Sequence, residues 1–122
     1  MGQPIVHFEI FGADAEALRL FYRDTFGWKL MTIPDGTYTM VDTESGEGHL
    51  HGGIGSEAET EQRVLLYIQV PDIDDHLARI TEAGGQVIRE RSDYGVVITA
   101  LARDPAGNVF GLSEEPAPPQ PH

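Results

Sequence analysis

The sequence contains no cysteine and few basic residues, and these two absences exclude several classes of protein. Without cysteine, the 122-residue chain has no disulfide, no thiolate-bound zinc and no thiol nucleophile. Eight Lys and Arg residues stand against 20 Asp and Glu residues, which gives a net charge of −12. This charge opposes binding to nucleic acid and to anionic membranes, which requires clustered basic side chains. A cationic or neutral small molecule is the favoured partner, although an acidic surface also serves solubility.

Long apolar runs and the common catalytic loops are also missing. The longest aliphatic stretch, Val96 to Ala102, is far too short to span a bilayer, and the N-terminus has no signal-peptide pattern. The sequence has no Gly-rich phosphate loop, no GxSxG nucleophile elbow and no EF-hand. We therefore expect a cytoplasmic protein that does not enter membranes.

What is present is an order of elements that occurs twice. In the first half, an alternating strand is followed by an amphipathic helix that begins at Asp14 and ends at Gly27, and then by three short strands. The second half has the same order, with its helix beginning at Asp72. A shift of about 58 residues superimposes the two halves, and it places Asp14 on Asp72, Gly27 on Gly85 and Gly53 on Gly111.

The repeat predicts an α+β fold made of two βαβββ modules. The modules span residues 5–54 and 64–112 and are joined by a linker at 55–63. Each module alone is too small for a stable core, so we expect one domain over residues 1–115. The Pro-rich residues 116–122 are expected to be a disordered tail.

Alternation along the strands separates a face that packs on each helix from a face that lines a cavity. The first strands place His7 and Glu9, and in the second module Leu65, Tyr67 and Gln69, on the cavity side. The last strands are expected to add His49, His51, Gly53, Val109 and Gly111. This mixed set suits a ligand cavity better than a uniform core.

The paired modules, the stretch DAEALRLFYRDTFGW and the ending DPAGNVFGL resemble the vicinal oxygen chelate superfamily. This superfamily includes glyoxalase I, bleomycin-resistance proteins, methylmalonyl-CoA epimerase and extradiol dioxygenases. The resemblance covers about residues 5 to 113 and implies a curved sheet around a cavity. It also implies a homodimer with shared sites.

In the metalloenzymes of that superfamily, ligands come from the first and last strands of each module. The resemblance places His7 at one ligand position, but the other three hold Leu65, Gly53 and Gly111, none of which can bind a metal. His51 could join His7 as a ligand through a bulge at the glycines. Alternatively, His7 and Glu9 form a general acid–base pair, or they are a polar edge of the cavity.

Other residues are candidates for ligand contacts. Tyr38 and Tyr67 could stack on an aromatic or planar cationic ligand, or they could be structural. Gly111 is interpreted as a widened, ligand-poor pocket floor. The residues expected to bind a ligand are His51, Tyr67, Leu65, Tyr38, Val109 and Gly111.

Three functions are compatible with these features. The favoured one is a small-molecule-binding protein of the bleomycin-resistance type, which takes a cationic or aromatic compound in a dimer cavity and lacks the full metal site. The alternative is an enzyme, a lyase, isomerase or dioxygenase that depends on a divalent metal bound by His7. A structural or partner-binding subunit is the third and least favoured, because nothing in the sequence indicates an exposed docking surface. All three stay open because a fold that hosts many chemistries does not fix function.

Overall fold

Each half of the chain begins with a strand that leads into a helix. The structure is a computed structural model and describes residues 2–43 and 50–115. In order along the chain, its elements are β1 (Ile5–Phe11), α1 (Ala15–Phe26), β2 (Lys29–Thr32), β3 (Tyr38–Asp42), β4 (His51–Gly55), β5 (Val64–Val70), α2 (Ile73–Glu82), β6 (Gln86–Asp93), β7 (Ile98–Arg103) and β8 (Val109–Glu114). The predicted α+β fold of two βαβββ modules is confirmed.

The predicted caps set the start of both helices and the end of the first. The Asp14 side chain accepts a hydrogen bond from the Ala17 backbone N–H at 3.0 Å, and Asp72 accepts one from Asp75 at 3.2 Å. Each carboxylate thus satisfies a backbone donor that has no partner within the helix. Gly27 ends α1 with φ of 73°, a left-handed conformation that favours glycine.

The second helix ends earlier than the repeat predicts. Its last residue is Glu82, and the C-cap is Ala83 rather than Gly85. The neighbouring glycine with positive φ is Gly84, at 93°. Gly85 serves another purpose, since a Cβ there would approach the Arg103 carbonyl oxygen to 2.5 Å. Close packing of the backbone therefore explains this glycine.

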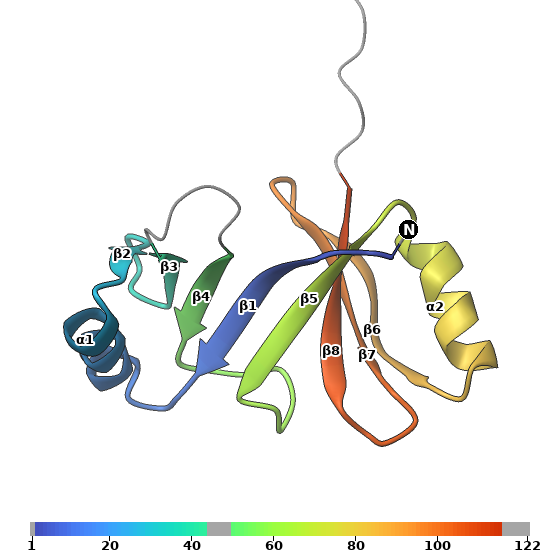
Figure 1. Ribbon diagram of the computed structural model, residues 1–122, viewed down its shortest axis with the longest axis horizontal. Helices are drawn as coiled ribbons and strands as arrows, with labels where there is room; N and C mark the ends of the chain where they lie inside the picture. Colours follow the sequence, from blue (N-terminus) through green and yellow to red (C-terminus); the bar gives the residue numbers. More distant parts are fainter. Residues whose placement is uncertain (1, 44–49, 116–122) are drawn as a thin grey trace, which may run out of the picture. The chain divides into compact units, whose positions relative to one another are not determined.

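The chain divides into two compact units, Val6–Leu66 and Met1–Ile5 together with Tyr67–His122. In the first, the strands run in the order β2-β3-β4-β1, and β1 pairs with β4 in parallel while the other pairs are antiparallel. The second repeats this pattern as β5-β8-β7-β6, with β5 and β8 parallel. Figure 1 shows α1 next to β2 and α2 next to β6, one helix for each set of strands.

The core of the unit that holds α2 is aliphatic. Ile73 and Leu77 of the helix pack with Val70, Ala100 and Leu112 of the strands. Ile68 and Phe110 also contact this cluster, as the predicted strand faces require. Burial of such side chains contributes about 1.5–3 kcal/mol each to folding, so this cluster holds α2 on its strands.

The unit that holds α1 is packed by aromatic rings. Trp28 stacks on Tyr22 with ring centroids 4.9 Å apart and lies 5.6 Å from the ring of Phe8. Phe21 and Phe26 contact the same cluster but are 55% and 58% exposed. These two rings therefore lie at the surface of the cluster rather than in its interior.

The remaining predictions concern the C-terminal tail, His49 and the absence of a membrane-spanning helix. The tail at 116–122 and His49 lie outside the described residues. Among the helices that the structure describes, none has the length and apolar character needed to cross a bilayer, and the longer of the two has 12 residues.

Candidate functional site

The strands of the unit Val6–Leu66 bring the predicted polar residues onto one face. In the pairing of β1 with β4, His7 lies opposite His51, and in the pairing of β4 with β3, His51 lies opposite Asp42. Partners in neighbouring strands point to the same side of a sheet, so these three side chains form a row. We call this side the His7 face; it carries His7, Glu9, Lys29, Met31, Tyr38, Met40, Asp42 and His51.

A second row crosses the same face beside the first. Glu9 lies opposite Gly53, Gly53 lies opposite Met40, and Met40 lies opposite Met31 on the edge strand β2. Met40 and Met31 are 55% and 67% exposed. Apolar thioether side chains and a carboxylate therefore lie in line on one surface.

Tyr38 connects the two predicted catalytic residues. Its hydroxyl group donates a hydrogen bond of 2.8 Å to the Glu9 Oε2 atom. The His7 Nε2 atom lies 3.3 Å from the same hydroxyl oxygen. Because the phenolic hydrogen goes to Glu9, the contact with His7 requires the imidazole to donate from Nε2, which leaves the lone pair on Nδ1.

The surroundings of His7 favour its neutral form. Burial lowers the pKa of the His7 imidazole below its ordinary value of 6.5, the Glu9 carboxylate raises it, and His51 lowers it. Burial is the largest of these influences, and the net shift is downward. At pH 7 the ring is therefore uncharged and able to accept a proton.

Aromatic rings occupy the space above the glycines of these strands. A Cβ at Gly53 would overlap the Tyr38 ring, and one at Gly111 would overlap the Tyr67 ring. The interpretation of Gly111 as the open floor of a pocket is therefore wrong, because the Tyr67 ring fills that space. On the helix side, Gly52 makes room for the ring of Phe8 in the same way.

The predicted ligand-binding residues of the other half are buried. Leu65, Tyr67 and Val109 are 3%, 7% and 4% exposed, and Gly111 is buried beneath Tyr67. Tyr67 lies opposite Gly111 in the pairing of β5 with β8. The roles of these four residues in ligand binding stay predictions, whereas the polar groups gather on the His7 face.

The comparison with known families decides the identity of the fold. The model of the glyoxalase/bleomycin resistance protein/dioxygenase superfamily matches residues 4–112, nearly the whole chain. The chain belongs to this superfamily. A glyoxylase-like domain-containing protein of Didymella fabae is 26% identical over 116 residues, which cover 88% of this chain and 91% of that protein.

Solved structures of other proteins share the same fold. A member from Vibrio splendidus 12B01 superimposes with a TM-score of 0.67 at 17% identity, covering 93% of this chain and 100% of that one. The methylmalonyl-CoA epimerase from Mycobacterium tuberculosis gives a TM-score of 0.63 at 18% identity, covering 93% and 88%. At these identities the likeness concerns the fold alone.

The residues present do not fit the metal arrangement that the superfamily implies. Of its four ligand positions, His7 alone carries a donor, since the others are Leu65, Gly53 and Gly111. Within residues 2–43 and 50–115, no group of three or more His, Asp or Glu side chains is placed to hold a metal ion. His7 and His51 do lie opposite each other, and a metal held by this pair stays a prediction. We derive no chemical step through a metal.

Two features of the site were missed by sequence reasoning. Sequence reasoning left Tyr38 as either a stacking or a structural residue and did not place its hydroxyl group between Glu9 and His7. Asp42 was not considered, although it extends the row of His51. Both features depend on the pairing of β3 with β4. That pairing cannot be predicted from the residues of one strand at a time.

Proposed function

We propose that the chain is a small-molecule-binding protein that takes a cationic or aromatic compound on the His7 face, without the full metal site of the superfamily. The observation that carries this proposal is the row of Glu9, Gly53, Met40 and Met31. It offers a counter-ion at one end and an apolar surface at the other. A cation with an apolar body has the matching chemistry.

The carboxylate of Glu9 is the proposed counter-ion. It is partly buried and accepts the hydroxyl hydrogen of Tyr38. Its hydrogen bond to Tyr38 fixes its position, and partial burial strengthens its attraction to a positive group. The net charge of −12 adds a long-range field that draws cations towards the protein.

The apolar end of the ligand is proposed to rest on methionine and tyrosine. Met31 and Met40 adapt to ligands of different shape because their side chains are flexible and polarizable. The Tyr38 ring lies over Gly53, between Met40 and Glu9, and a planar cation can stack on such a ring. From this set we expect a preference for aromatic cations over aliphatic ones.

The cavity is proposed to be completed in a homodimer. The exposure of two methionines on this face supports the proposal, because a second protomer would cover apolar surface that otherwise contacts water. A cytoplasmic location, where such a protein would meet metabolites and antibiotics, stays a prediction.

The chemistry open to a bound molecule is proton transfer to His7. Its neutral ring can take a proton on Nδ1, while Nε2 remains directed at Tyr38. Glu9 then stabilises the protonated imidazole of His7 through the Tyr38 hydroxyl group. His7 is thus the proposed base, and Glu9 supports it.

A thermal unfolding experiment tests the binding proposal. The protein is heated with 3-phenylpropylammonium, with other aromatic and quaternary cations, and with the neutral 3-phenylpropanol as the matched control. Ligands that bind the folded state raise the midpoint temperature Tm, so the cations are expected to raise it more than the alcohol. If no cationic compound raises Tm, the proposal is overturned.

A further inference from the structure

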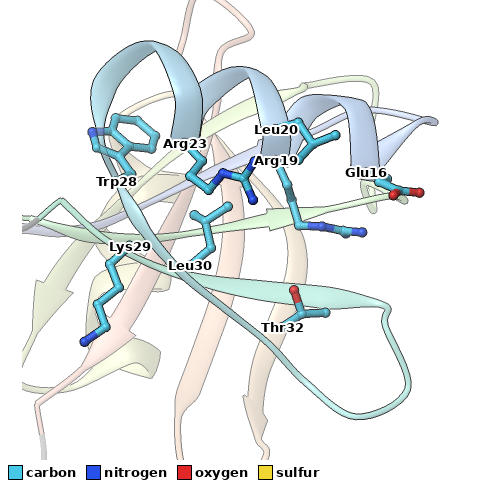
Figure 2. A pocket seen from close by; sticks show the side chains of 8 residues that line it. All are labelled: Glu16, Arg19, Leu20, Arg23, Trp28, Lys29, Leu30 and Thr32. Atoms are coloured by element: carbon cyan, nitrogen blue, oxygen red, sulfur yellow. The ribbon is translucent and has the colours of Figure 1, made fainter.

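A groove lies between α1 and the edge strand β2, on the side of the strands opposite the His7 face. Its volume is about 470 Å³, within the range of small-molecule sites. Figure 2 shows the side chains that line it: Glu16, Arg19, Leu20 and Arg23 from α1, Trp28 before β2, and Lys29, Leu30 and Thr32 from β2. We call it the α1–β2 groove.

Positive charge is concentrated in this groove. Three of the eight basic residues of the chain line it, together with a single acidic residue, Glu16. The chain as a whole carries a net charge of −12. A local excess of cations in an acidic protein therefore needs its own explanation.

The arginines of this groove are only weakly neutralised by the residues that the structure describes. Arg19 makes no side-chain ion pair or hydrogen bond with any of them. Lys29 lines the groove, but the strand register places its side chain opposite Asp42, on the His7 face. Arg23 pairs with Asp24 at 2.9 Å, but both side chains are more than half exposed. Such surface pairs are weak, because water and salt screen them. The guanidinium groups are therefore available to an anion.

The rest of the lining is apolar. Leu20 contributes to it from α1 and Leu30 from β2, and Trp28 lies at one end (Figure 2). The Trp28 ring is fixed from behind by its stacking on Tyr22. A rigid aromatic wall and two aliphatic side chains match a ligand that has an apolar body as well as a charge.

We propose that the α1–β2 groove is a second binding site, which takes an organic carboxylate with an apolar body. Guanidinium groups bind carboxylates through paired hydrogen bonds, and here Arg19 and Arg23 of α1 lie beside an apolar lining. This site goes beyond the proposed function, because it lies on the other side of the strands and prefers the opposite charge.

Trp28 makes the proposal directly testable. It is the only tryptophan in the chain and lines the groove, so its fluorescence reports on an occupant. The protein is titrated with 3-phenylpropionate, with the neutral 3-phenylpropanol and with inorganic phosphate. We expect a saturable change with the carboxylate that weakens as salt is added, and at least about tenfold weaker binding of the alcohol. Phosphate is expected to leave the emission unchanged, since it has no apolar body.

A charge variant and a matched control complete the test. Arg19→Gln with Arg23→Gln removes the two guanidinium groups of the groove, and Arg63→Gln with Arg79→Gln removes two elsewhere. We expect at least about tenfold weaker binding of 3-phenylpropionate for the first pair and unchanged binding for the second. Equal affinity for carboxylate and alcohol in the wild-type protein overturns the proposal, and so does a response to phosphate alone. Both results are obtained with the wild-type protein, so neither depends on whether a variant folds.

Discussion

Tyr38 decides how His7 and Glu9 act, because its hydroxyl group lies between them. The phenol donates to Glu9 at 2.8 Å and lies 3.3 Å from the His7 Nε2 atom. Gly53 permits this arrangement, since any side chain there would collide with the tyrosine. A glycine that looked like an empty ligand position thus serves to place a hydrogen-bonding group.

The pKa of His7 should respond in opposite directions to substitution of its two ionisable neighbours, Glu9 and His51. We expect its pKa, measured by NMR of the imidazole ring, to lie below 6.5. Glu9→Gln should lower it further, since a nearby negative charge stabilises the imidazolium, and His51→Gln should raise it. A midpoint above 6.5, or an increase in Glu9→Gln, would contradict the electrostatics described.

The same shift makes the stability of the protein depend on pH. The unfolded chain binds a proton at His7 near pH 6.5, whereas the folded chain binds it only at lower pH. The free energy of unfolding should therefore decrease as the pH falls from 6.5 towards the lower folded pKa. This part of the decrease should be absent from His7→Gln.

Gly111 is expected to be required for packing against the Tyr67 ring. Gly111→Ala places a methyl group against the Tyr67 ring, and such overpacking costs about 1–3 kcal/mol of unfolding free energy. In a Tyr67→Leu background the same substitution should cost much less, because the ring is gone. Urea denaturation of the four proteins measures both effects, and an equal cost in both backgrounds would refute the account of this glycine.

Strand faces were predictable from alternation, but contacts between strands were not. His7 and Glu9 share a face because a strand has a period of two, and the structure bears this out. The placement of Tyr38 over Gly53 depends on the pairing of β3 with β4, which the residues of one strand do not determine. Ring packing at Gly111 was missed for the same reason.

Helix starts were predictable because their signals are local. Asp14 and Asp72 both accept backbone hydrogen bonds as expected. The end of α2 was placed too late, since Gly85 was assigned to a cap although it is needed where the backbone of Arg103 approaches. A glycine has more than one use, so its position alone does not fix a boundary.

The cap of α1 can be tested on its own. Asp14→Ala removes the acceptor of the Ala17 N–H, and we expect the free energy of unfolding to fall by about 1 kcal/mol. Asp14→Asn keeps an acceptor oxygen and should be close to the wild-type protein. Denaturant midpoints that are the same for Ala and wild type would show that the cap contributes nothing.

For the whole molecule, charge and the repeat have separate consequences. The repeat predicted the order of elements in both units because the two share their start signals. The ionisable side chains do not follow the repeat, because the counterparts of His7 and Glu9 in the second module are Leu65 and Tyr67. The predicted acid–base pair, His7 and Glu9, therefore occurs only in the first module. The repeat alone does not explain this difference between the modules.

Dimer formation should depend on salt. Each protomer carries a net charge of −12, so two protomers repel each other, and added salt screens this repulsion. We expect sedimentation velocity to show a larger dimer fraction at about 0.5 M NaCl than at about 0.05 M. A protein that stays monomeric at both salt concentrations would contradict the proposed homodimer.

The most direct test of the central claim is the affinity of 3-phenylpropylammonium for variants that each lack one carboxylate. Isothermal titration compares the wild-type protein, Glu9→Gln, and Glu82→Gln, which removes an exposed carboxylate from the end of α2. If the His7 face binds the cation, Glu9→Gln should bind at least about tenfold more weakly, and Glu82→Gln should match the wild type. Equal affinity in Glu9→Gln and wild type would contradict the claim that this face is the binding site.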